Sequence, residues 1–149
     1  MDVTQAHALT SILDAMADGI YIVNDDYVAN SDVLVLRYGD VEGRTNTSGV
    51  AASTLYVRSL TSYSAEVVLG SGVGSSKIPD SARYSVYNYP YNIAVYYVRP
   101  CSVKSTTNCD SSADGGKPVP TLVRRTLSGT ALVEEPLVEG VETLQIRFG

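Results

Sequence analysis

Residues 93–98 read IAVYYV and form one of the longest apolar runs of the chain. Their β-branched and aromatic side chains favour a strand, and their number suits one strand of a sheet. A membrane-spanning helix needs about 20 apolar residues, so this run is too short to be one. The chain after Gly19 repeats the pattern, with short apolar runs bounded by Gly, Ser, Asn, Asp and Pro. We therefore expect a β-rich protein.

The other predicted strands follow from the same signals. Residues 32–38 are apolar on both faces until Arg37, which favours a buried central strand. Residues 143–148 alternate between apolar and polar, which is typical of a sheet with one wet face. The full set of predicted strands is residues 20–23, 32–38, 54–58, 66–69, 83–89, 93–99, 121–125, 131–133 and 143–148.

Residues 4–18 are predicted as a helix, because their apolar side chains recur at helical spacing. Gly19 would end this helix. Its single apolar face should pack on a sheet. The chain is therefore predicted to be one α+β domain over residues 1–149, with a short N-terminal helix packed on a mostly antiparallel sheet. A length of 149 residues suits one ordinary domain.

Composition narrows the function. Acidic residues number 16 and basic residues 11, so the formal charge is −5. Nucleic-acid binding needs a cationic face, so no nucleic-acid partner is expected. His7 is the one histidine, and no GxSxG motif is present. A catalytic triad needs a base held against a nucleophile, and nothing around His7 provides one. We expect no enzyme, no catalytic residue and no cofactor.

Cys101 and Cys109 are the only cysteines and flank a polar stretch. Their spacing is too wide for a CxxC motif, and no second pair completes a zinc site. Two alternatives remain, a disulfide that closes an exposed loop or two free thiols. The disulfide is favoured, and it would indicate an oxidising compartment.

The following loop partly matches a calcium-binding template. Asp110, Ser112 and Asp114 occupy its first, third and fifth positions, and Gly115 occupies the sixth. The twelfth position is Thr121, where the template requires a bidentate Glu. The loop is therefore either a weak Ca²⁺ site or a polar turn beside the cysteines.

Tyrosine is the abundant aromatic residue. There are 11 tyrosines against one Phe and no Trp, and more than half of them lie in residues 84–97. Tyr87, Tyr89 and Tyr91 alternate, so they would share one strand face unless Pro90 bends the strand. They are candidates for a partner-binding strip. The alternative is that they fill half-buried positions, with each hydroxyl reaching water or backbone.

Four segments, in order, resemble motifs of the PilW family of type IV pilus minor pilins. They are residues 31–39 (SDVLVLRYG), 94–99 (AVYYVR), 120–125 (PTLVRR) and 137–149 (LVEGVETLQIRFG). The resemblance implies a pilin-like globular domain and a non-catalytic role in fimbrium biogenesis. The subunit would prime assembly in a complex at the pilus tip and support cell adhesion or twitching motility.

The resemblance also implies partners and a location. The partners would be other minor pilins, the major pilin and a PilY-type tip adhesin. The location would be the periplasm and the cell-surface pilus, with anchoring in the inner membrane before assembly. Members of the family are anchored by an N-terminal hydrophobic helix that is not in this sequence, so we expect the chain to be a fragment. The alternative function is an extracellular adhesive or glycan-binding module that uses the tyrosines or a calcium-stiffened loop.

Overall fold

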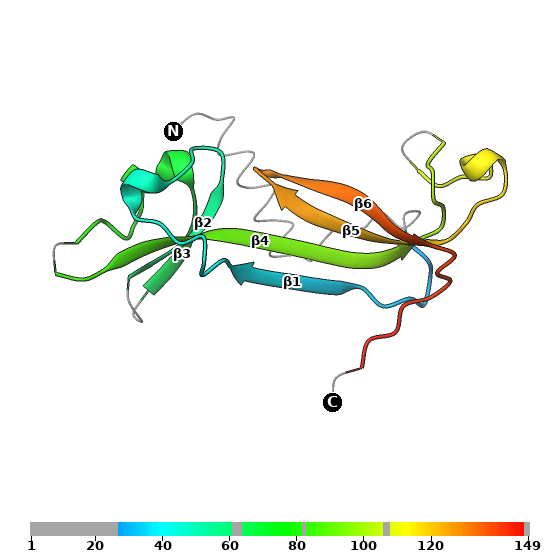
Figure 1. Ribbon diagram of the computed structural model, residues 1–149, viewed down its shortest axis with the longest axis horizontal. Helices are drawn as coiled ribbons and strands as arrows, with labels where there is room; N and C mark the ends of the chain where they lie inside the picture. The colour runs from blue at the N-terminus through cyan, green and yellow to red at the C-terminus, as the bar shows by residue number, and fades with distance from the viewer. Residues whose placement is uncertain (1–26, 61–63, 82, 106–107, 148–149) are drawn as a thin grey trace. The chain divides into compact units, whose positions relative to one another are not determined.

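The computed structural model describes residues 27–60, 64–81, 83–105 and 108–147 (Figure 1). Strands account for 43% and helical turns for 10% of these residues, and no helix of seven or more residues occurs among them. The fold class is therefore a mostly antiparallel β-sheet, and the predicted α+β class, with a helix packed on the sheet, is wrong. Residues 4–18, the predicted helix, lie outside the described residues. The prediction assigned the fold class from a single helical segment. Every later segment has strand-forming sequence, which favours an all-β class.

The regular elements are six strands and three short 3₁₀ helices. The strands are β1 (Leu34–Gly39), β2 (Leu55–Leu60), β3 (Ser64–Leu69), β4 (Val86–Arg99), β5 (Thr121–Ser128) and β6 (Ala131–Glu139). The 3₁₀ helices are η1 (Thr47–Gly49), η2 (Gly70–Ser75) and η3 (Ala113–Gly115). Hydrogen bonds link the strands in the order β3-β2-β4-β5-β6, and β1 pairs with β4. The pairs β2–β3, β2–β4 and β4–β5 are antiparallel.

The long strand β4 joins two predicted strands, residues 83–89 and 93–99, into one. Pro90 does not break it. Pro90 lies opposite Tyr56 at the end of the pairing with β2, so its missing N–H interrupts no continuing ladder. Its carbonyl accepts a hydrogen bond from the backbone N–H of Asp40 at 2.8 Å. A proline is tolerated here because only its acceptor is used.

The ends of the predicted strand set also differ from the structure. Residues 143–147 form no regular strand, since the backbone N–H groups of Leu144 and Ile146 donate to side-chain oxygens of Ser31 and Asp32. Residues 131–133 extend into the longer strand β6, which runs through Pro136. The predicted strand over residues 20–23 lies outside the described residues.

Strand β1 is exposed, although its apolar sequence predicted a buried central strand. Val35, Leu36 and Tyr38 are 36%, 43% and 55% exposed. The strand order explains the difference, because β1 branches from β4 and is not part of the main path. Apolar side chains on both faces show that a strand is suited to burial. Whether it is buried depends on the strands and loops packed around it.

The chain divides into two compact units. Unit 1 consists of Met1–Val35, Ala94–Thr126 and Leu132–Gly149, and unit 2 of Leu36–Ile93 and Leu127–Ala131. The core of unit 1 includes Val95, Tyr97, Val98 and Val123, and the core of unit 2 includes Leu55, Tyr56, Val73 and Ile78. Strand β4 continues from one unit into the other. The single domain over residues 1–149 stays a prediction.

Candidate functional site

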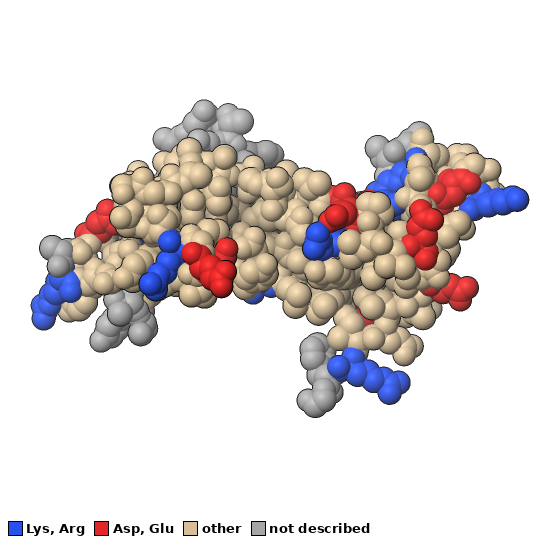
Figure 2. All heavy atoms as spheres, in the orientation of Figure 1, with Lys and Arg blue, Asp and Glu red and all other residues tan. Residues whose placement is uncertain are grey.

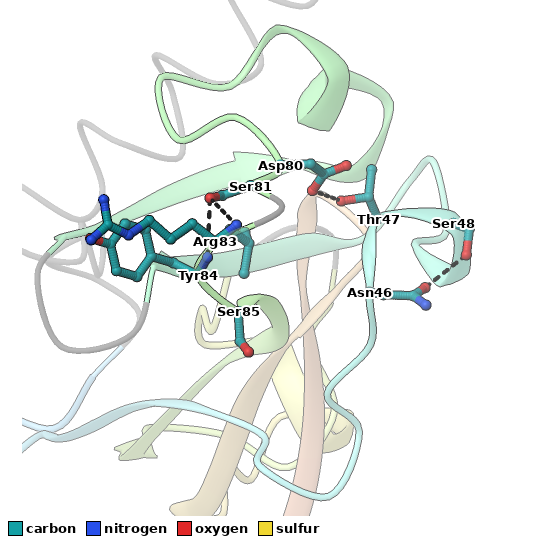
Figure 3. A pocket seen from close by; sticks show the side chains of 9 residues that line it. Asn46, Thr47, Ser48, Asp80, Ser81, Arg83, Tyr84 and Ser85 are labelled. Atoms are coloured by element: carbon teal, nitrogen blue, oxygen red, sulfur yellow. Dashed lines mark hydrogen bonds between the residues drawn. The ribbon is translucent and has the colours of Figure 1, made fainter.

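Unit 2 contains a pocket of about 430 Å³ with a mostly polar lining (Figure 3). Its walls come from η1 and the residue before it, from the loop that precedes β4, and from the first residue of β4. The lining residues are Asn46, Thr47, Ser48, Asp80, Ser81, Arg83, Tyr84, Ser85 and Val86. Hydroxyl, amide and charged side chains from these segments therefore line one opening.

Arg58 of β2 supports this pocket from within unit 2. The residue is 1% exposed. Its guanidinium donates to the carbonyl of Ile78 at 2.7 Å and to Oδ1 of Asn88 at 2.9 Å. It also donates to Oγ1 of Thr47 at 3.0 Å and to Oδ1 of Asp80 at 2.7 Å. A buried cation with several acceptors holds two pocket residues in fixed positions.

Asp80 presents a charged acceptor at the pocket. Its side chain is 63% exposed, and its Oδ1 accepts hydrogen bonds from Thr47 and Arg58. The hydrogen bond from Thr47, and then that from Arg58, lower the pKa of Asp80. The carboxylate is therefore ionised at neutral pH. Among the described residues, no hydrogen bond reaches its second oxygen, Oδ2.

The remaining walls are formed by local turns. Ser81 Oγ accepts hydrogen bonds from the backbone N–H groups of Arg83 and Tyr84, at 3.2 and 3.1 Å. The Arg83 guanidinium lies 5.4 Å from the centre of the Tyr84 ring, and the two side chains lie alongside each other in Figure 3. Asn46 Oδ1 accepts from Ser48 Oγ and from the N–H of Gly49, so the side-chain amide nitrogen of Asn46 points away from these two donors.

Sequence reasoning missed this pocket. Its residues lie in two polar stretches, residues 46–48 and 80–85, which are separated by β2, β3 and η2. The available signal was the concentration of hydroxyl and amide side chains in both stretches. That signal does not distinguish a pocket from ordinary turns, which use the same residue types.

Unit 1 contains the predicted disulfide. Cys101 and Cys109 are joined with a Cα–Cα distance of 5.5 Å, so the alternative of two free thiols is wrong. Arg99, which is 5% exposed, donates from Nε to the carbonyl of Cys101 at 2.8 Å and from Nη2 to the carbonyl of Ser102. The base of the closed loop is therefore attached to β4. The oxidising compartment stays a prediction.

A half-buried carboxylate also contacts this region. Glu134 of β6 accepts from the Tyr97 hydroxyl and the Arg99 guanidinium, and Lys104 Nζ lies 3.5 Å from it. Burial alone would raise the pKa of Glu134. The hydrogen bond from Tyr97 and the charges of Lys104 and Arg99 outweigh that effect, so the pKa lies below its ordinary value. Glu134 stabilises unit 1 as an anion.

The calcium-loop candidates lie in one loop, where Asp110 and Ser112 bond to each other and Asp114 has other partners. Asp110 Oδ1 accepts from the backbone N–H and the hydroxyl of Ser112, at 2.8 and 2.6 Å. The hydrogen bond from the Ser112 hydroxyl, followed by that from Ser105, lowers the pKa of Asp110 to about 2. The Asp110 side chain therefore caps a local turn by accepting both hydrogen bonds from Ser112.

Asp114 acts as a clamp for the loop, because its carboxylate binds backbone N–H groups from three places in it. Its Oδ2 accepts from the N–H groups of Ser102 and Val119, and its Oδ1 from the N–H of Val103. The bond from Val119 is the leading cause of the lowered pKa of Asp114. Among the described residues, no group of three or more His, Cys, Asp or Glu could hold a metal ion. The Ca²⁺ site stays a prediction.

The three tyrosines do not share one environment. Tyr87 and Tyr89 are half-buried, with ring centres 6.3 Å apart in an edge-to-face arrangement, and Arg44 lies 5.0 Å from the Tyr87 ring centre. Tyr91 is buried, and burial raises its pKa. The buried positions shift phase across Pro90, from Asn88 to Tyr91. The predicted alternation of Tyr87, Tyr89 and Tyr91 on one face did not include this shift. Tyr87 and Tyr89 are therefore partly accessible, and Tyr91 is not.

Charge does not single out a patch on the face that Figure 2 draws. On the face drawn in Figure 2, acidic and basic side chains are interspersed and most of the surface is uncharged. Among the described residues, no helix is long and apolar enough to cross a membrane. No family model, curated protein or solved structure matches the chain.

Proposed function

We propose that the chain is a structural subunit of a type IV pilus, a minor pilin that acts through protein–protein contacts. The observation that carries the proposal is that the four segments that resemble the PilW family contact one another within unit 1. Residues 94–99, 120–125 and 137–149 lie wholly in that unit, and residues 31–39 begin in it.

The first and last of these segments are joined although they are far apart in sequence. The N–H of Asp32 donates to the carbonyl of Leu144 at 2.9 Å, and the N–H of Leu144 donates to Ser31 Oγ at 2.9 Å. The N–H of Ile146 donates to Asp32 Oδ2 at 2.8 Å. These bonds support the idea that residues 31–39 and 137–149 belong to one scaffold.

The two middle segments are joined as neighbouring strands. Residues 94–99 pair with β5 from Ala94 opposite Thr126 to Arg99 opposite Thr121. The carbonyl of Pro120 accepts from the N–H groups of Gly140 and Val141, at 2.8 and 3.1 Å. All four segments thus contribute to hydrogen bonding in unit 1, which supports a scaffold role for them.

The test is made in the organism that carries the gene. Deletion should reduce the number of surface pili, and the chain should be detected by antibody in filaments sheared from wild-type cells. Complementation with the wild-type gene should restore both. Normal piliation after deletion, together with a chain found only in the medium, would contradict the proposal.

A matched pair of glycine variants refines the test. Gly140 has a φ of 76°, so a β-branched side chain there is strained, whereas an added Cβ at Gly74 meets nothing within 4 Å. Gly140→Val should lower the ratio of chain in filaments to chain in the cell, and Gly74→Val should not. Equal ratios for the two variants would exclude a role in assembly for the turn at Gly140.

A further inference from the structure

We propose that the polar pocket of unit 2 binds a neutral saccharide. The pocket is open to solvent and of a size that ligand sites commonly have, roughly 300–1,000 Å³. Its lining has one apolar aliphatic residue, Val86, so it offers little to an apolar ligand. The proposal does not depend on the pilus role.

The free hydrogen-bonding groups of the pocket match a sugar hydroxyl, which both donates and accepts. Asp80 Oδ2 is an acceptor that takes no bond from the described residues. The Asn46 amide nitrogen is a donor, because Oδ1 of this amide is used by Ser48 and Gly49. Ser81 Oγ already accepts two backbone N–H groups, so its hydroxyl hydrogen is left to donate.

The pocket lining includes one charge of each sign, the ionised Asp80 carboxylate and the Arg83 guanidinium. A ligand of a single charge is therefore attracted by one group and repelled by the other. Both groups form strong charge-assisted hydrogen bonds with neutral hydroxyls. A ligand with several adjacent hydroxyls can use both signs of charge at once.

Two further features suit a pyranose ring. Tyr84 is 44% exposed, and the part of its ring that the Arg83 guanidinium does not cover offers an aromatic surface to the apolar C–H groups of the sugar. Arg58 holds Asp80 and Thr47 in place before any ligand arrives, which reduces the entropy that binding must cost. An open, shallow site of this kind predicts weak binding, with a Kd of about 1 mM.

The test is a titration of the purified, isotope-labelled chain followed by amide NMR shifts. The probes are glucose, galactose, mannose and N-acetylglucosamine, with glucuronate and sulfate as anionic comparisons. At least one neutral sugar should shift the amides of residues 46–48 and 80–86, saturably and with little effect elsewhere. Tyr84→Ala should weaken that sugar at least tenfold, and this variant leaves the Arg58 contacts intact.

Asp80→Asn removes the charged acceptor, and Asp40→Asn is its control, since Asp40 lies in unit 2 outside the pocket lining. Asp80→Asn should weaken the sugar at least tenfold, and Asp40→Asn should leave the affinity unchanged. The proposal is overturned if no neutral sugar shifts these amides, if only glucuronate or sulfate does, or if Tyr84→Ala binds as well as the wild type.

Discussion

Two buried arginines, Arg58 and Arg99, organise the polar interior of the described residues. Arg58 is 1% exposed and Arg99 5% exposed. Burying a cation costs roughly several kcal/mol in lost hydration unless hydrogen-bond acceptors surround it. Both guanidinium groups have backbone carbonyls and a carboxylate as acceptors. Each arginine therefore connects a strand to the loops around it.

Replacement of Arg58 by methionine should destabilise unit 2. The change removes the guanidinium donor from the carbonyl of Ile78 and from Oδ1 of Asn88 in a buried site. We expect a loss of about 2–4 kcal/mol in the free energy of unfolding. Urea denaturation measures it, with Arg83→Met, an exposed arginine, as the control. Equal denaturation midpoints for the two variants would contradict a structural role for Arg58.

Glu134 predicts a pH dependence of stability. Its pKa is lower in the folded chain than the ordinary value of 4.5. The folded state therefore binds fewer protons than the unfolded state in this range, and the stabilisation is full above pH 4.5. It is lost as the pH falls through the lower folded pKa. Thermal unfolding of the wild type should show this loss, and Glu134→Gln should lack that part of it.

A matched control for Glu134→Gln is Glu135→Gln. Glu135 is 55% exposed and pairs with Arg124 at 2.6 Å on the surface. Exposed pairs contribute little to stability, so this variant should retain the pH dependence that Glu134 causes. If both variants follow the wild-type curve, the Tyr97, Arg99 and Lys104 contacts of Glu134 do not govern acid stability.

At the scale of elements, β6 lies at the end of the strand order. Val133, Leu137 and Val138 of this strand are 52%, 40% and 52% exposed. An apolar edge strand invites pairing with another chain, and proline reduces that tendency because it offers no N–H. Pro136 in the middle of β6 has this effect.

Pro136→Val should therefore increase self-association, because it adds a backbone donor and an apolar side chain to an exposed strand. Light scattering over a concentration series measures the mean mass. Pro118→Val, in an exposed stretch without regular structure, should leave the mass unchanged. A Pro136→Val chain that stays at the wild-type mass would show that β6 is protected in another way.

The disulfide loop is held both covalently and by Asp114. The double variant Cys101→Ser, Cys109→Ser should lose at most about 2.5 kcal/mol in the free energy of unfolding, because the closed loop is short. Asp114 should still hold Ser102, Val103 and Val119 in the variant. Denaturant titration measures the loss. A variant that does not fold would show that the clamp alone is insufficient.

At the scale of the whole molecule, most strand signals within the described residues were confirmed, whereas the predicted helix lies outside them. The strands β2, β3 and β5 lie where β-branched and aromatic residues predicted them, within a few positions. Pro90 was interpreted as a residue that could bend the strand, yet it lies inside β4, and Pro136 likewise lies inside β6. Their neighbours decide this, because a proline is harmless where no N–H is needed.

The predicted sites show the same division. The pairing of Cys101 with Cys109 followed from a count, since the chain has no other cysteine. The burial of Tyr91 and the pocket around Asp80 did not follow from spacing. Residues 46–48 lie beside residues 80–81 and 83–85 because β2, β3 and η2 return the chain, and a local sequence pattern does not contain that return.

The sequence by itself determined a β-rich chain with a single pair of cysteines, because strand propensity and a cysteine count are local or countable properties. The tertiary structure decided which strands are exposed, which arginines are buried and where polar groups converge on a pocket. These depend on contacts between residues far apart, such as Arg58 with Asp80 and Ser31 with Leu144. The physical reason is that the burial and the hydrogen-bond partners of a residue depend on which other residues the folded chain places around it.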